Sequence, residues 1–184
     1  MEHRMYYVMT CLSPAQGYLA TLDYDDSADP DFLRSWMSGD RFDVPPPTPL
    51  VLTRETAPDT VLAELWQSPV TLMSKRLHAA LLAAGVSNLD IYPAEIHDPA
   101  QGVVHDDYVA FNLIGRIAAA DSLRRHDDVL ISAPEISAAR VDGALMFRLA
   151  EAVNTIVVHD SVKQAIEAAG IDTLTFIDPA DWTG

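Results

Sequence analysis

The strongest constraint on the fold is a pattern that occurs twice, 85 residues apart. HAALLAAGVSNLDIYP begins at His78, and KQAIEAAGIDTLTFID begins at Lys163. In each copy an apolar stripe at helical spacing ends at a glycine, Gly85 or Gly170, and an extended segment follows. Glycine readily takes the left-handed conformation that ends a helix. The pattern therefore predicts two similar strand–helix–strand units.

A short apolar strand is expected before each helix, in PVTLMS and in NTIVVHD. Ser74 is placed to cap the first helix, and Ser161 with Gln164 has the spacing of a capping box before the second. No glycine-rich phosphate loop opens either helix, so we expect a scaffold and no nucleotide site. The alternative to a repeat is that two unrelated strand–helix–strand units happen to have the same apolar stripe and glycine stop.

The remaining pattern predicts an α+β fold, with a mixed sheet and helices packed on it. Residues 1–184 suit a single domain, and the alternative is a less regular lobe, 1–66, joined to a repeat-containing lobe, 67–184. The other elements expected are strands within residues 6–12, 94–98, 106–118 and 127–136, and helices near residues 32–37, 59–68 and 144–154.

Charge restricts the class of partner. The chain has 27 Asp and Glu against 12 Lys and Arg, a formal net charge of −15. Such a surface repels nucleic acid and anionic membranes, and it favours encounter with a basic protein. Solubility alone is the alternative explanation. No apolar run reaches the ~20 residues of a membrane span, and Cys11 has no disulfide partner, so we expect a cytoplasmic protein.

The acidic segment DYDDSADPD, from Asp23 to Asp31, is the densest group of carboxylates in the chain. It could contact a basic partner, with nearby aromatic side chains as anchors. A solvated loop, with the aromatic side chains in a local core, is the alternative. The candidate binding residues are Asp25, Asp26, Asp29, Asp31 and Trp36.

Four histidines precede an aspartate, a pairing found in metal-dependent hydrolases. Here the pairs fall at predicted strand ends, turns and a helix start, which favours solvated side chains. Cys11 lies in an apolar strand, where a core role is expected. We therefore predict no catalytic residue, metal site or cofactor, and keep a metal-dependent hydrolase as the alternative. The pairs are His97–Asp98, His105–Asp106, His126–Asp127 and His159–Asp160.

Arg148 stands in an otherwise apolar run, between Phe147 and Leu149. A buried guanidinium without a carboxylate is costly. We expect a structural ion pair with Asp121 or Asp142, and a partner contact is the alternative.

Three segments resemble a bacterial family: VTLMSKRLHAALLAAGVSNLDIYP, YVAFNLIGRIAAADSLRR and LMFRLAEAVNTIVVHDSVKQAIEAAGIDTLTF. The family is immunity protein family 11 of polymorphic toxin systems, formerly a domain of unknown function, and the resemblance covers roughly residues 60–178. His159 departs from it, since similar sequences often carry a small polar residue there. The matching motif positions are Asp121, Ser122, Arg148, Gly85 and Gly170.

The resemblance implies a non-enzymatic cytoplasmic protein that binds and neutralises a cognate toxin. It supplies no catalytic residues, and it implies an architectural role for the matching positions. A regulatory interaction module of another kind is a further alternative.

Overall fold

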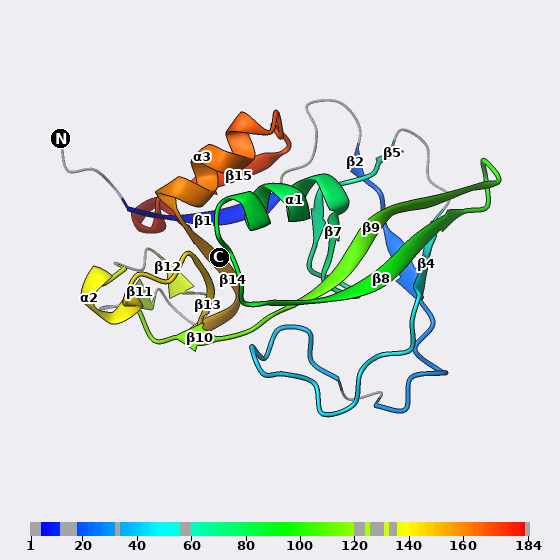
Figure 1. Cartoon of the computed structure of the whole chain (residues 1–184), viewed down its shortest axis with the longest axis horizontal. Helices are drawn as coiled ribbons and strands as arrows, with labels where there is room; N and C mark the ends of the chain where they lie inside the picture. The colour runs from blue at the N-terminus through cyan, green and yellow to red at the C-terminus, as the bar shows by residue number, and fades with distance from the viewer. Residues whose placement is uncertain are drawn as a thin grey trace.

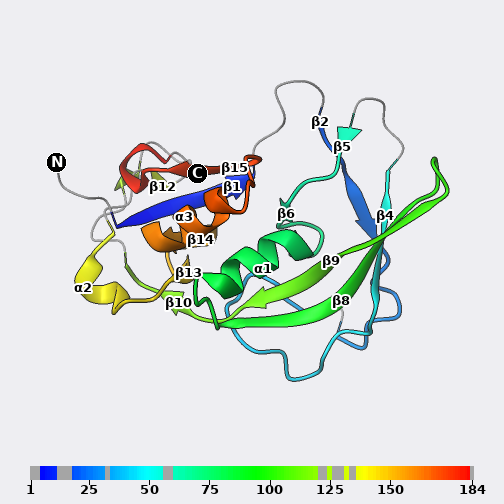
Figure 2. The same cartoon turned by 45° about the horizontal axis from the view of Figure 1, so that its top comes forward.

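Strands predominate over helices in this chain. The computed structural model describes residues 5–11, 18–31, 34–55, 60–119, 124–125, 131–132 and 136–182. Over these residues the fold is mixed α/β and mostly β, with two larger sheets and two longer helices packed together (Figures 1 and 2). The expected combination of sheet and helix is confirmed at this level.

The first sheet has six strands and carries the longest hairpin. β8 and β9 pair antiparallel over most of their length and extend beyond the rest of the sheet as an arm (Figure 1). β4 lies parallel to β8, and the other pairs are antiparallel. The order is β3 (Leu22–Tyr24), β4 (Leu50–Arg54), β8 (Leu89–Asp98), β9 (Val103–Leu113), β7 (Leu72–Ser74) and β6 (Leu65–Trp66).

The second sheet has five strands and joins distant parts of the chain. The order is β10 (Arg116–Ile117), β13 (Met146–Leu149), β14 (Ala152–His159), β1 (Tyr6–Cys11) and β15 (Leu174–Ile177). β1 lies between β14 and β15 and is antiparallel to both. Strands from residues 1–66 thus occur in both large sheets.

Short elements complete the described structure. They are the pairs β2 (Tyr18–Leu19) with β5 (Thr60–Val61) and β11 (Arg124–Arg125) with β12 (Ile131–Ser132), the helices α1 (Lys75–Ala83), α2 (Ala138–Val141) and α3 (Asp160–Ala168), and the 3₁₀ helix η1 (Pro179–Asp181).

Both longer helices connect strands that flank a third strand. β7 and β8, joined by α1, each pair antiparallel with β9. β14 and β15, joined by α3, each pair antiparallel with β1. The glycine that follows each helix has positive φ, 91° at Gly85 and 71° at Gly170, which confirms the predicted helix ends.

The two helices begin differently. Ser74 accepts a hydrogen bond from the backbone N–H of Leu77, as predicted. In α3 the cap is the ring of His159, which accepts from the backbone N–H of Ser161. The predicted capping box is wrong, because α3 starts at Asp160 and Gln164 donates to the Asp160 carboxylate.

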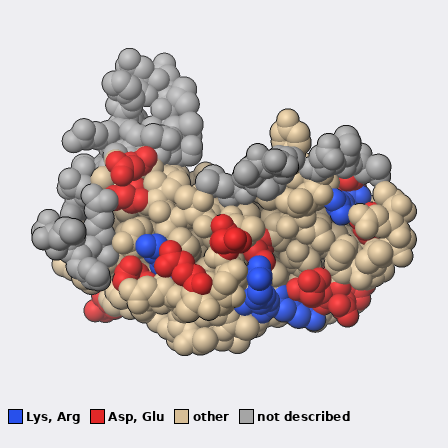
Figure 3. Space-filling view, turned by 90° about the horizontal axis from the view of Figure 1, so that it is seen from above, with Lys and Arg blue, Asp and Glu red and all other residues tan. Residues whose placement is uncertain are grey.

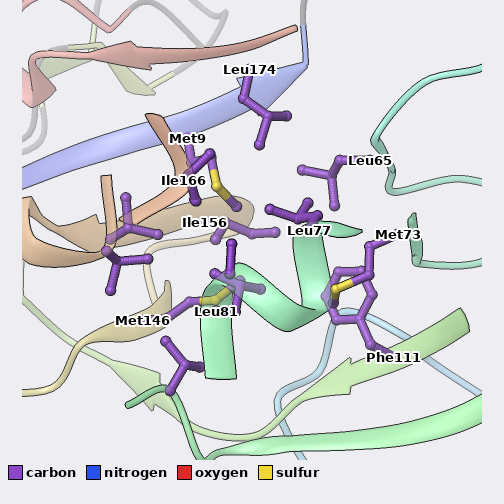
Figure 4. Packing of buried hydrophobic residues seen from close by; sticks show 14 of the residues in the cluster. Met9, Leu65, Met73, Leu77, Leu81, Phe111, Met146, Ile156, Ile166 and Leu174 are labelled. Carbon is purple, nitrogen blue, oxygen red and sulfur yellow. The ribbon is translucent and has the colours of Figure 1, made fainter. Parts of the chain in front are cut away.

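The main core lies where α1 and α3 meet the facing strands of both sheets (Figure 4). Each fully buried Leu, Ile or Val contributes about 1.5–3 kcal/mol relative to exposure. One apolar cluster therefore holds the two sheets together. It includes Met9, Met73, Leu77, Leu81, Phe111, Met146, Ile156, Val158, Val162 and Ile166.

Two further clusters lie on the other faces of the sheets. One packs behind the first sheet and contains Trp36, Leu52, Trp66, Ile96 and Tyr108. The other packs behind the second sheet and contains Tyr6, Val8, Phe147, Leu149 and Val157.

Two predicted helices are wrong. The described part of residues 59–68 forms β5 and β6, and residues 144–154 contain β13 and the start of β14. A short apolar run is compatible with the spacing of a helix and with the alternation of a strand. In β13 all four residues are buried, because strands pair on both sides and clusters cover both faces. Tertiary pairing thus overrides the local pattern.

Two other expectations fall partly outside the described residues. Arg34 to Met37 form a loop and a turn, so no helix is present there, and Phe32 and Leu33 lie outside. Of the strand expected at 127–136, Ile131–Ser132 forms β12. No helix among the described residues is long and apolar enough to cross a membrane.

Two neighbouring leucines of α1 test the shared core. Leu81 is 0% exposed and Leu82 is 55% exposed. Leu81→Ala should lower the free energy of unfolding by about 2–5 kcal/mol, since it removes buried atoms and leaves a cavity. Leu82→Ala should change it by less than about 0.5 kcal/mol. Urea unfolding measures both, and equal losses would contradict this packing.

Candidate functional site

The acidic segment contains an internal ion pair. The Arg34 guanidinium contacts Asp29 through two hydrogen bonds, Nη2 to Oδ1 at 2.8 Å and Nε to Oδ2 at 3.1 Å. Both side chains are almost fully buried, 2% and 4% exposed. The hydrogen bond from Arg34 lowers the pKa of Asp29. Asp29 therefore stabilises the loop and does not present its carboxylate to a partner.

The other three aspartates of the set differ in exposure. Asp25 and Asp26 are exposed. Hydrogen bonds from the side chain of Ser27 and from its backbone N–H lower the pKa of Asp25. Asp31 is half-buried and its backbone N–H donates to the Asp29 carboxylate. Only part of the predicted acidic surface is therefore available to a partner.

Trp36 belongs to a local aromatic core. It is 8% exposed and packs edge-on against Phe42 and Tyr92, at ring-centroid distances of 5.0 and 5.8 Å. The Arg34 guanidinium lies 4.6 Å from the centroid of the Phe42 ring. Of the two roles that the sequence left open for Trp36, a binding anchor or part of a local core, its burial favours the local core.

The three His–Asp pairs within the described residues do not form a metal-binding group. His97 faces Glu95, with Nε2 3.2 Å from Oε2. Asp98 lies on the opposite face of β8, where it pairs with Arg54 at 2.8 Å, because successive strand residues alternate. His159 caps α3, and His126–Asp127 lies outside the described residues. Nowhere in the described structure do three or more His, Cys, Asp or Glu residues form a group that could hold a metal.

Cys11 is a partly buried thiol at the end of β1. Its Sγ lies 3.6 Å from the carbonyl oxygen of Thr173. Burial raises the pKa of the thiol, and the thiolate is the nucleophilic form. These surroundings favour the expected structural role.

Arg148 is fully buried and makes no ion pair with a described carboxylate. Its Nη1 donates to Gln67 Oε1 at 3.0 Å and to the Val153 carbonyl at 2.8 Å, and its Nη2 donates to the Trp36 carbonyl at 3.5 Å. Its Nε has no hydrogen-bond partner in the part of the chain that the structure describes. Burial lowers the pKa of Arg148 to about 10, so it remains charged at neutral pH.

The described carboxylate predicted to pair with Arg148 does not do so. Asp142 is exposed at the end of α2 in a left-handed conformation with φ 49°, so the expected pair with it is wrong. Asp121 and Ser122 lie outside the described residues. Neutral oxygens from three segments, at Gln67, Trp36 and Val153, take the place of the carboxylate.

A hollow of about 420 Å³ opens where the N-terminus of α1 meets β8 and β9. Its charged lining is Lys75, Glu95 and Asp106, and the ring of the buried Tyr108 is part of its wall. Carboxylates also occur in several groups over the surface seen in Figure 3, with fewer Lys and Arg side chains among them. The acidic character is therefore distributed and is not confined to the loop.

No protein-family model matches the chain, and no curated protein matches it. The functional argument therefore depends on the residues and their geometry. The sequence pattern missed Arg34, although a cation five residues after Asp29 was a visible signal. It also missed Gln67 as a partner of Arg148, because a single polar residue after an apolar run does not indicate a specific contact.

The buried contact between Arg148 and Gln67 can be tested by a double-mutant cycle. Arg148→Met should cost about 2–4 kcal/mol, because it leaves three buried or partly buried oxygens without their donor. Gln67→Leu removes one of these oxygens, so the double variant should lose less than the sum by about 0.5–3 kcal/mol. Chemical unfolding of the four proteins measures the coupling, and strict additivity would show that the contact contributes nothing.

Tyr108 predicts a stability change at alkaline pH. Its hydroxyl donates to the Ala63 carbonyl at 3.1 Å, and burial raises its pKa well above the ordinary value of about 10. Above pH about 10 the Tyr108 hydroxyl of the unfolded chain loses its proton while that of the folded chain keeps it. The free energy of unfolding therefore falls as the pH rises. Tyr108→Phe should cost about 1 kcal/mol at neutral pH.

That difference between the wild type and Tyr108→Phe should shrink as the pH rises above about 10, because the variant has no proton to lose. Unfolding curves at a series of pH values give the result. A constant difference would indicate that Tyr108 ionises as easily in the folded chain as in the unfolded one.

Proposed function

We propose that this chain is an immunity protein of immunity protein family 11, which binds a cognate bacterial toxin in the cytoplasm and neutralises it by forming a stoichiometric complex. The observation that carries the proposal is the excess of carboxylates, a net charge of −15, with carboxylates in several groups on the face seen in Figure 3. An inhibitor needs a complementary surface and no reactive side chain. The geometry of the His–Asp pairs, Cys11 and Arg148 agrees with such a role.

The charge gives the interaction an electrostatic character. An acidic protein attracts a basic partner over a distance set by the ionic strength, about 10 Å at 0.1 M salt. This attraction raises the association rate by about 10- to 1,000-fold. A cytotoxic nuclease, which needs a basic surface to bind its nucleic acid, has the matching charge.

We also infer that the two strand–helix–strand units are copies of one repeated unit and that both have a structural role. α1 and α3 have equal lengths, and every bound of α3 lies 85 residues after that of α1. Ser74 pairs with Tyr108 on β9 as His159 pairs with Tyr6 on β1. In this interpretation Gly85, Gly170 and Arg148 are architectural, and we propose the same for Asp121 and Ser122.

The deciding experiment is co-expression with the neighbouring gene. We expect a reading frame beside this gene to encode a protein that stops growth when expressed alone and is tolerated when this chain is present. The purified pair should form a complex of fixed stoichiometry, and its association rate should fall at least about tenfold between low and high salt.

The control is a destabilised chain, Leu81→Ala, which should protect cells less well in proportion to its loss of folded protein. If no adjacent reading frame is toxic and rescued by this chain, the proposal loses its basis. Stoichiometric metal in the purified protein, with hydrolysis that depends on a His–Asp pair, would favour the metal-dependent hydrolase instead. A non-toxic binding partner would favour a regulatory interaction module.

A further inference from the structure

The outer half of the first sheet has one uncovered face. On β4 and β8 every second residue is buried against the cluster that contains Trp36 and Trp66. The residues between them lie on the other face, since strand side chains alternate. Those residues are exposed or half-exposed: Val51, Thr53, Pro93, Glu95 and His97.

Strand register adds Val104 of β9 to this face. Val51 is opposite Glu95, Thr53 is opposite His97, and His97 is opposite Val104. Val51 is 40% exposed and Val104 is 53% exposed. We call these six residues, with Asp106, the arm face: Val51, Thr53, Pro93, Glu95, His97, Val104 and Asp106.

α1 covers this side of the sheet only at its inner end. Ile91, Val109 and Phe111 pack there into the core that contains α1. Figure 2 shows the helix over the inner part of β8 and β9, with the hairpin extending beyond it. The hollow of about 420 Å³ lies at this boundary, and Ile91, Pro93 and Val109 give it apolar walls.

The carboxylates at the hollow are gathered by an irregularity in the strand pairing. The register between β8 and β9 shifts between Ala94 and Ile96, so that Asp106 and Asp107 together stand opposite Glu95. Like charges opposite each other destabilise a sheet. Among the described residues, the Glu95 carboxylate has the His97 ring as its polar partner, at 3.2 Å, and Asp106 forms no ion pair.

We propose that the arm face is where the toxin docks, through a Lys or Arg side chain of the toxin that enters the hollow. The apolar stem of that side chain would pack on Pro93 and Val109, and its cationic end would reach Glu95 and Asp106. Apolar groups of the toxin beside it would cover Val51 and Val104. This inference rests on the proposed function and names its contact surface.

The acidic loop is a weaker candidate for the same role. The Asp29 carboxylate is already neutralised by Arg34, and Trp36 is buried. The arm face instead combines exposed apolar side chains with two carboxylates, Glu95 and Asp106, which outnumber Lys75, the one described Lys or Arg that lines the same hollow. A buried cationic anchor within an apolar surround is the typical composition of a binding hot spot.

The test compares charge-matched variants in binding to the purified protein of the toxic neighbouring reading frame. Glu95→Gln with Asp106→Asn should weaken the complex at least about tenfold. Asp142→Asn with Asp172→Asn removes the same charge at exposed positions elsewhere and should have little effect. Calorimetry gives the affinities, and thermal unfolding confirms that each variant is folded.

Equal affinity of the Glu95/Asp106 variant and the wild type would overturn the inference and leave the proposed function intact. The inference would also fail if Asp25→Asn with Asp26→Asn weakened the complex and the arm variant did not. Val104→Asp places a charge on the apolar part of the arm face and should weaken the complex too.

A synthetic hexapeptide of alternating arginine and leucine tests the surface without the toxin. At low ionic strength it should shift backbone amide resonances of residues 49–54, 91–97 and 103–109, and these shifts should vanish in the Glu95/Asp106 variant. A glutamate–leucine hexapeptide is the control. Shifts confined to residues 23–31, or no shifts at all, would overturn the inference. Peptide binding at the arm face without any toxic neighbour would contradict the proposed function alone.

Discussion

The packing of α1 against α3 is the interaction on which the rest of the structure depends. Each helix lies on a different sheet, and their apolar stripes meet in one core with Leu77, Leu81, Val162 and Ile166. Because this core takes one face from each sheet, neither sheet can bury its apolar side chains alone. The position of the arm, and the absence of helix from its outer half, follow from where α1 ends.

Arg148 makes a second connection between the two halves, of a different kind. It sits on β13 and holds oxygens from Gln67, Trp36 and Val153 without a carboxylate. The net contribution of such buried hydrogen bonds to stability is small. Removing either the guanidinium or an oxygen leaves the other group buried without a partner, which is costly. Arg148 therefore favours one arrangement of the three segments over others, which gives the surrounding strands a defined position.

The sequence predicted α1, α3 and their glycine ends well, because in each helix an apolar stripe at helical spacing runs up to a glycine. The strands β7 and β15 beside them were also predicted, although the cap predicted for α3 was not the one observed. Residues 144–154 were assigned wrongly because Met146 to Leu149 are buried on both faces, and a strand of that kind has no alternation to recognise. The shape of the hollow depends on chain segments that meet only in the folded state, so it was not predicted, whereas Arg34, five residues after Asp29, was close enough in the sequence to be recognised.

The place of β1 has a consequence for how the protein is made. Its six residues pair with β14 and β15, whose residues lie about 150 to 170 positions later in the chain. Contacts between such distant segments slow folding, because a long loop must close before they form. The second sheet is therefore incomplete until translation has passed β15, and a shortened chain would carry an open slot beside β14.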